Sequence, residues 1–327
     1  MSREQRTQVS TMLRQPRPDG PQSVEAMRAG FKAMMARMVV PDGLRTTWTT
    51  LGDRPSLYVE PGNEPGDEPG NETRTGPHNG PHTQTRTGTI LYFHGGGWVF
   101  GSPETAMSLT GNLVARTGFA AYSPDYRLAP EHPFPAAIED ALSAYRALLD
   151  NGEDPSAIAF AGDSAGGGLS VTACLAARDA GLPMPAAVVA FSPGLDATRT
   201  GESMDTKAGV DPFFTRESLG HTGAMYLAGA DPYQPLLSPA VLADLTGFPP
   251  MLLQAGTDEV LLDDSTRLAS RAREAGVDVI LDITADVPHV FQSFAGVLDE
   301  ADQALDRAAL FLTQRVHGPA TAAGPAR

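Results

Sequence analysis

The chain has 327 residues, with 39 acidic and 24 basic side chains and a formal net charge of −15. This length is sufficient for a large hydrophobic core, and an apolar fraction of 41% excludes a chain that is disordered throughout. The negative charge argues against nucleic acid or an anionic membrane as the main partner, and a single cysteine, Cys174, excludes an internal disulfide.

The amino-terminal part contains one predicted helix. Residues 1–20 are polar and interrupted by prolines, without an apolar stretch of signal-peptide length. No later apolar run approaches the ~18 residues that span a bilayer, so we expect a cytoplasmic protein without membrane insertion. Residues 24–38 carry Met27, Phe31 and Met34 at helical spacing, which predicts one apolar helix face. That face either packs in a core or forms a methionine-rich wall over an apolar pocket.

Residues 61–88 form the clearest break in composition. They contain five prolines and six glycines, with no aliphatic or aromatic side chain. Such a segment cannot bury enough surface to offset its loss of conformational entropy. We therefore predict a disordered insertion over 61–88, without a catalytic task, and a disordered tail over 318–327.

After the insertion, short β-rich runs alternate with helical patterns. The expected strands are 89–93, 119–123, 157–161, 186–191, 251–254 and 277–283, and the expected helices are 135–149, 165–179, 266–275 and 299–315. This alternation predicts an α/β fold with an open, mainly parallel sheet and helices on both faces. Ligands of such sheets bind beyond the carboxyl ends of the strands.

A Gly-x-Ser-x-Gly motif, Gly-Asp-Ser-Ala-Gly at 162–166, lies between an expected strand and an expected helix. A sharp turn from strand to helix lifts the serine hydroxyl above the sheet, and the flanking glycines remove side chains that would collide there. The positive amino end of the following helix points towards the same place. Ser164 is therefore the predicted nucleophile, and a plain turn of small residues is the alternative.

A second glycine-rich segment, His-Gly-Gly-Gly-Trp at 94–98, directly follows the expected strand 89–93. Consecutive glycines allow backbone N–H groups to face a ligand without obstruction by Cβ atoms, as an oxyanion hole requires. A phosphate-binding loop is the competing use, but the sequence lacks the lysine that it needs. We predict that Gly96, Gly97 and Ala165 provide the oxyanion-hole N–H groups and that His94 is structural.

The general base is found by elimination among seven histidines. Six of them lie in the insertion, the tail, the glycine loop, a proline-bounded turn or an irregular region, which leaves His289 before the last helix. Its ordinary pKa of about 6.5 suits proton transfer at neutral pH. Asp258, after the expected strand 251–254, is the predicted orienting acid, and Glu259 is its nearest rival. The order Ser164, Asp258, His289 is that expected of an α/β-hydrolase.

Four motifs together resemble the bacterial hormone-sensitive-lipase family of esterases, also called family IV. They are the glycine loop at 94–98, Tyr-Arg-Leu-Ala-Pro-Glu-His-Pro at 126–133, Gly-Asp-Ser-Ala-Gly-Gly at 162–167, and Asp-Glu-Val-Leu at 258–261 together with His289. The likeness runs from about Leu91 to Phe311. Residues 192–196 and 245–264 look most similar to a branch of monoterpene lactone hydrolases and related esterases. Two positions depart from the pattern, because Val290 replaces the usual glycine and Gly194 stands where an aromatic residue is common.

The resemblance implies an α/β-hydrolase core with a helical cap. Its expected divisions are an amino-terminal cap segment at 1–50, a first core part at 51–195, a cap insertion at 196–247 and a second core part at 248–317. The implied activity is serine-dependent hydrolysis of small to medium, neutral, apolar carboxylic esters through an acyl-enzyme, without metal or organic cofactor. Short acyl chains are expected to be preferred. The candidate pocket residues are Trp98, Phe213, Phe214, Gly194 and Val290, with a purely structural role for the aromatic side chains equally open.

Three alternatives stay open at this point. Within hydrolases, the substrate is a cyclic lactone or an acetylated secondary metabolite instead of a simple ester. Outside them, the same fold also serves as a non-catalytic receptor for small molecules, typically after loss of the histidine. A homodimer is the generic expectation for the oligomeric state.

Overall fold

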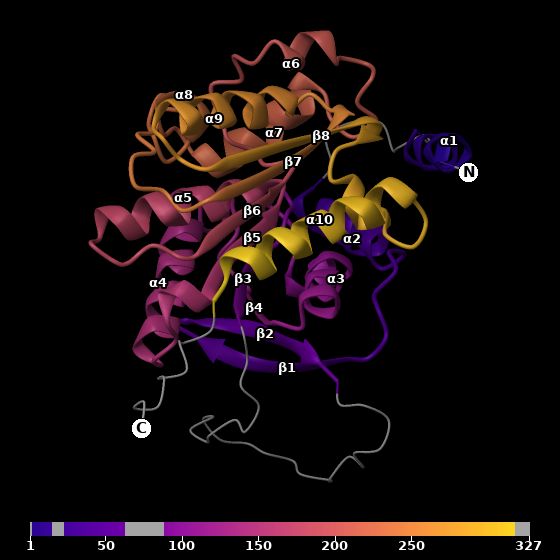
Figure 1. Cartoon of the computed structure of the whole chain (residues 1–327). Helices are drawn as coiled ribbons and strands as arrows, with labels where there is room; N and C mark the ends of the chain where they lie inside the picture. The colour runs from indigo at the N-terminus through magenta and orange to yellow at the C-terminus, as the bar shows by residue number, and fades with distance from the viewer. Residues whose placement is uncertain (1, 15–22, 63–87, 318–327) are drawn as a thin grey trace, which may run out of the picture.

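The computed structural model describes residues 2–14, 23–62 and 88–317 (Figure 1). The predicted tail and residues 63–87 of the predicted insertion lie outside this part of the chain. The described strands are β1 (Leu44–Leu51), β2 (Arg54–Pro61), β3 (Thr89–Phe93), β4 (Ala120–Pro124), β5 (Ile158–Asp163), β6 (Ala187–Phe191), β7 (Met251–Asp258) and β8 (Val279–Pro288). The described helices are α1 (Ser2–Leu13), α2 (Val24–Met35), α3 (Met107–Thr117), α4 (Ala136–Asp150), α5 (Ala165–Asp179), α6 (Ser203–Thr206), α7 (Arg216–Leu227), α8 (Pro239–Leu242), α9 (Leu262–Glu274) and α10 (Asp299–Arg315), with 3₁₀ turns η1 (Pro103–Ala106), η2 (Pro155–Ala157) and η3 (Phe291–Phe294).

The described strands form one sheet in the order β1-β2-β4-β3-β5-β6-β7-β8. Neighbouring strands from β4 to β8 are parallel, whereas β2 is antiparallel to both β1 and β4. The mainly parallel sheet predicted from the sequence is therefore confirmed. The hairpin of β1 and β2 was not predicted, because β1 is an edge strand whose side chains are mostly exposed, so no apolar run marks it.

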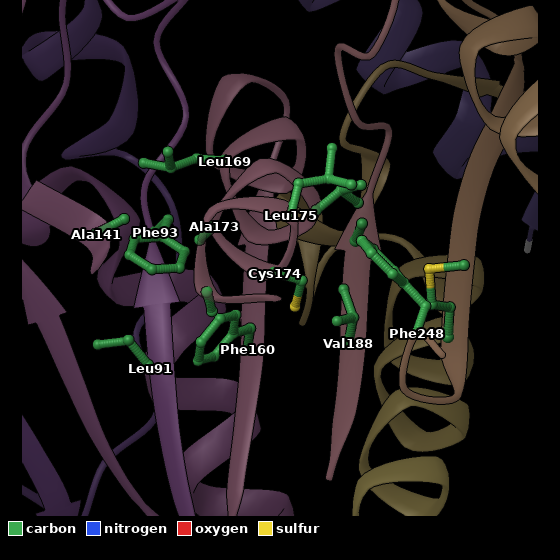
Figure 2. Close-up of a cluster of buried hydrophobic side chains, with 14 of the residues drawn as sticks. Leu91, Phe93, Ala141, Phe160, Leu169, Ala173, Cys174, Leu175, Val188 and Phe248 are labelled. Carbon is green, nitrogen blue, oxygen red and sulfur yellow. The ribbon is translucent and has the colours of Figure 1, made fainter. Parts of the chain in front are cut away.

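Alternate side chains of the central strands supply two hydrophobic cores, one on each face of the sheet. Leu91 and Phe93 of β3 pack with α4, α5 and α9, and part of this first core is shown in Figure 2. Ile90 and Tyr92 of the same strand pack with α3 and α10 in the second core. Figure 1 shows these two helix layers on either side of the sheet. The period of two along each strand thus gives the predicted arrangement of helices on both faces.

Helices α2 and α7 pack against the loop that follows β3. Arg28 of α2 donates from Nε to the carbonyl oxygen of Val99 at 3.0 Å and from Nη2 to that of Ala129 at 3.1 Å. Tyr226 of α7 stacks on Trp98, with ring centroids 4.5 Å apart. These contacts place both helices at the carboxyl end of the sheet, where a parallel α/β protein binds its ligand. None of the helices in the described ranges is both long and apolar enough to cross a membrane.

Candidate active site

Ser164 occupies a sharp turn at the centre of the carboxyl edge of the sheet. It is the single residue between β5 and α5, and its φ of 52° and ψ of −117° lie in a region that costs about 1–3 kcal/mol for a residue with a side chain. A Cβ atom on Gly162 would lie 2.4 Å from the carbonyl oxygen of Gly166, and one on Gly166 would lie 2.0 Å from that of Phe93. Both flanking glycines are therefore required by close backbone approach. The structure has the strand-turn-helix context that the motif predicted.

The glycine loop lies directly beside this turn. Gly96 and Gly97 have φ values of 124° and 60°, which a residue with a Cβ atom rarely adopts. The carbonyl oxygen of Gly96 accepts hydrogen bonds from Val99 and Phe100, both at 3.0 Å, so the loop closes on itself. Within the described ranges, the backbone N–H groups of Gly96, Gly97 and Ala165 donate to no other residue. Three unpaired donors therefore lie at the edge of the turn that carries the serine.

Asp163 fastens the glycine loop to the turn. Its Oδ1 accepts hydrogen bonds from the Tyr92 hydroxyl at 2.9 Å and from the Gly95 N–H at 3.1 Å. Burial raises the pKa of Asp163 to about 6, against the opposing effect of these hydrogen bonds. Ionisation of the carboxylate as the pH rises through this range strengthens both hydrogen bonds, because charge-assisted bonds are the stronger ones.

His94 has the structural role that the sequence predicted. It is buried, its Nδ1 lies 2.8 Å from the carbonyl oxygen of Gly95, and its ring stacks on Tyr126 with centroids 4.2 Å apart. Burial lowers the pKa of His94 to about 4, so the imidazole is neutral at physiological pH. The Tyr126 hydroxyl also donates to the His94 carbonyl oxygen at 2.7 Å. This part of the 126–133 motif thus supports the start of the glycine loop.

The acid that contacts His289 is Glu259, not the predicted Asp258. His289 Nδ1 lies 2.6 Å from Glu259 Oε2, and both side chains are buried. Asp258 is half-buried and accepts instead from the Thr257 hydroxyl at 3.2 Å. The reason is register: β7 and β8 both run further than expected, and Asp258 pairs with Pro288 at their ends. Glu259 and His289 are the residues that directly follow this pair, one after each strand. Their side chains therefore come together.

A hydrogen-bonded serine holds this pair in place. The Ser192 hydroxyl donates to Glu259 Oε1 at 3.0 Å and accepts from the Val290 N–H at 3.0 Å. The Gly256 N–H also donates to Glu259 Oε1, at 2.7 Å. The residue before Ser192, Phe191, accepts the Ser164 N–H at 2.8 Å. One short segment after β6 therefore connects the serine turn, the glutamate and the histidine loop. The resemblance noted for residues 192–196 did not indicate these contacts.

The electrostatic surroundings of His289 favour its protonated form. Burial alone would lower the pKa of His289, but the hydrogen bond and charge of Glu259 outweigh it, with smaller contributions from the charges of Asp211 and Asp163. The pKa of His289 is therefore raised above its ordinary value. Since Nδ1 faces a carboxylate, Nδ1 carries the proton of the neutral imidazole and Nε2 is the acceptor. Nε2 is buried and forms no hydrogen bond with any described residue.

Four of the predicted pocket residues lie next to these groups. The Phe214 ring packs edge-on against His289 with centroids 4.9 Å apart, and Phe213 lies further out at 6.4 Å. Gly194 donates its N–H to the Ser164 carbonyl oxygen at 3.0 Å, and a Cβ atom on Gly194 would lie 3.5 Å from the Trp98 ring. Gly194 therefore contacts the serine turn and lies beside the Trp98 indole, where a Cβ atom would make an ordinary van der Waals contact.

Val290 directly follows His289 in the chain. Its side chain is buried in the second core, and its φ of 49° is strained for a β-branched residue. Its backbone N–H contacts the site through Ser192. A part for the Val290 side chain in the pocket stays a prediction. In the part of the chain that the structure describes, no group of three or more metal-ligating side chains is arranged to hold a metal ion.

The comparisons with known proteins agree with this fold. A family described as "alpha/beta hydrolase fold" matches residues 90–293. An acetyl-hydrolase from Streptomyces hygroscopicus is 44% identical over 224 residues, which cover 68% of this chain and 75% of the relative. The crystal structure of an esterase from the bacterial hormone-sensitive lipase family has a TM-score of 0.85 and 38% identity, covering 96% of this chain and 98% of that one. EstE5, soaked with p-nitrophenyl butyrate, has a TM-score of 0.83 and 37% identity, with coverage of 95% and 98%.

The chain therefore belongs to the α/β-hydrolase family, in its bacterial hormone-sensitive-lipase group of esterases. This confirms the resemblance seen in the four sequence motifs. It is a carboxylic ester hydrolase, which is also what the sequence predicted.

Proposed function

We propose that Ser164, His289 and Glu259 form the catalytic triad of this carboxylic ester hydrolase. The single observation that supports it most is the buried 2.6 Å contact between His289 and Glu259, in a loop fastened through Ser192 to the segment that holds the serine turn. A histidine positioned by a carboxylate and a serine on a strained turn are the parts that nucleophilic ester hydrolysis requires. The amides of Gly96, Gly97 and Ala165 complete the proposal as the oxyanion hole.

Acylation follows from these roles. His289 Nε2 takes the proton of the Ser164 hydroxyl as its Oγ attacks the ester carbonyl carbon. The negative charge that develops on the carbonyl oxygen accepts hydrogen bonds from the three amides, and each such donor is worth about 10²–10³ in rate. The ester C–O bond then breaks, and the leaving alcohol takes the proton from Nε2.

Deacylation uses the same groups in reverse. His289 Nε2 removes a proton from water, whose oxygen attacks the carbonyl carbon of the acyl-enzyme. The bond to Ser164 Oγ breaks, the serine regains its proton, and the carboxylic acid leaves. Throughout, Glu259 keeps the proton of Nδ1 in place and stabilises the imidazolium that forms in each half-reaction.

The substrate that we propose is a small to medium, neutral, apolar ester with a short acyl chain. Supporting this proposal, the apolar Phe214 ring packs directly against His289, and the chain carries an excess of negative charge that disfavours anionic substrates. The name of the Streptomyces relative favours an acetyl ester of a larger metabolite as a second candidate. A lactone is the third.

A panel of p-nitrophenyl esters of increasing acyl length tests this proposal. Because the apolar Phe214 ring packs directly against the proposed base, kcat/KM is expected to be highest for acetyl to butyryl esters and to fall for long chains. A set of lactones and acetylated alcohols, run beside the panel, separates the three candidates. A maximum at a long acyl chain contradicts the proposal.

The pH dependence of hydrolysis is expected to report His289. Since the pKa of His289 is raised and its neutral form is the base, kcat/KM should fall as the pH drops, with an acidic limb above the ordinary histidine value of about 6.5. The acidic limb of the pH profile is measured with p-nitrophenyl butyrate, by following release of butyric acid at a series of constant pH values. Glu259→Gln should move it to lower pH, because the main group that stabilises the protonated imidazole is lost. A limb that stays in place in this variant contradicts the assignment.

A further inference from the structure

Asp211 connects two segments that lie on either side of His289. It is buried in the loop between α6 and α7, with 7% of its surface exposed. Its Oδ1 accepts hydrogen bonds from the N–H groups of Phe213 at 2.7 Å and Phe214 at 3.0 Å. Its Oδ2 accepts one from the Val260 N–H at 2.9 Å. One carboxylate therefore holds both the loop with the two aromatic rings and the residue that follows Glu259.

These contacts determine what His289 touches on two sides. On one side, Phe214 packs edge-on against the imidazole at 80°, in a position set by the Asp211 bond to its own N–H. On the other side, Glu259 is followed by Val260, whose backbone Asp211 also binds. A displacement of the histidine or its acid by about 1 Å costs on the order of 10²-fold in rate. The carboxylate that anchors their neighbours therefore affects the rate of the reaction.

We propose that Asp211 is a positioning residue of the active site, which fixes Phe214 and Glu259 around His289 and adds a second negative charge that favours the imidazolium. The inference rests on the proposed function, because it assumes that His289 is the base. Asp211 does not contact the reacting atoms. It acts through Phe214 and Glu259, and through its charge.

Three carboxylates from three different elements face His289. Glu259 follows β7 and is in contact with Nδ1, Asp163 ends β5, and Asp211 precedes α7. Burial raises the pKa of Asp211, whereas the charge of His289 and the three backbone N–H bonds lower it. The two groups therefore stabilise each other's charged forms. Loss of the Asp211 charge should lower the pKa of His289, although by less than loss of Glu259.

The test is Asp211→Asn. The amide has one oxygen, so it loses the charge and one of the two accepting atoms while the size of the side chain is kept. We expect kcat for p-nitrophenyl butyrate to fall on the order of 10- to 100-fold with little change in KM, and the acidic limb of kcat/KM to move to lower pH. Asp211→Glu keeps the charge, so its limb should stay near that of the native protein even where kcat falls.

Asp140→Asn is the matched control. Asp140 is also buried and also binds a backbone N–H, that of Arg127 at 2.8 Å, but it lies in α4 away from the histidine. The Asp140→Asn variant should have a lower melting temperature but the same acidic limb of kcat/KM as the native protein. A folded Asp211→Asn protein with native kcat and limb, or an equal shift in the control, overturns the inference.

The two proposals fail in distinguishable ways. Activity that survives in Ser164→Ala contradicts the triad itself, whereas a native pH profile in Asp211→Asn contradicts the role of Asp211 alone. If Asp211→Asn does not fold, Asp211→Ser replaces it. The serine hydroxyl can still accept a backbone N–H in the loop while the charge is absent. The same downward shift of the limb is expected there, and an unchanged limb overturns the inference.

Discussion

Ser164→Ala is expected to abolish ester hydrolysis, with a loss in kcat on the order of 10⁶-fold, because the hydroxyl that forms the acyl-enzyme is removed. The fold should be unaffected, since the hydroxyl of Ser164 forms no hydrogen bond with any described residue and the β-carbon of the turn is kept. The change is measured as kcat for p-nitrophenyl butyrate, beside circular dichroism spectra and melting temperatures of both proteins.

A matched serine provides the control for this variant. Ser143 lies in α4, where its hydroxyl donates to Asp53 at 3.3 Å near the molecular surface. Ser143→Ala should retain native kcat. Full activity in purified Ser164→Ala protein contradicts the proposed nucleophile.

Glu259→Gln is expected to cause the second large loss in kcat. The glutamine keeps the size of the side chain but loses the charge that stabilises the imidazolium, and it can present its amide N–H to Nδ1 and enforce the wrong tautomer. A loss in kcat of about 10⁴-fold is expected, by analogy with carboxylate-to-amide changes at serine triads. The measurement is kcat with a short-chain ester at the pH of maximum activity.

Asp258→Asn is the matched comparison, because it makes the same chemical change one residue earlier. Asp258 is half-buried and accepts a hydrogen bond from the neighbouring Thr257 hydroxyl, so kcat should stay within a factor of about three. A larger loss in Asp258→Asn than in Glu259→Gln contradicts the assignment of the acid and restores the interpretation made from the sequence.

The difference between these two acids shows where sequence reasoning reaches its limit. The nucleophile turn and the glycine loop follow from local motifs, whose residues are needed at adjacent positions for steric reasons. The bounds of β3, α5 and α10 also agreed with the predicted ranges. The choice between Asp258 and Glu259 depended instead on how far β7 and β8 run and on their register, which is set by pairing between strands that the sequence pattern did not resolve.

Other features were missed for the same physical reason. Ser192 and Asp211 act through contacts with residues far away in the sequence, such as Glu259 and Val260. Asp211 lies in no motif identified in the sequence, and the resemblance noted for residues 192–196 did not indicate what Ser192 contacts. The helix α3 was also missed, because its polar residues Ser108, Thr110 and Asn112 are buried together with its apolar ones, so no separate apolar stripe marks it.

Backbone strain is concentrated where these elements meet. Among the described non-glycine residues, positive φ values occur at Trp98, Ser164, Ser192 and Val290, all in or beside the proposed site, and at three positions elsewhere. Each such residue costs about 1–3 kcal/mol and persists only where surrounding packing over-determines it. The two hydrophobic cores of the sheet and the hydrogen bonds of Asp163, Ser192 and Glu259 hold these strained residues in place.

Labelling with a fluorophosphonate tests the central claim most directly, because this reagent requires an activated serine and also separates a hydrolase from a receptor with the same fold. The native protein is labelled, digested and mapped by mass spectrometry. We predict one phosphonyl group per chain, on Ser164, with labelling strongly slowed in Glu259→Gln and absent in Ser164→Ala. Absence of labelling in the native protein, or a modified serine other than Ser164, would contradict the account.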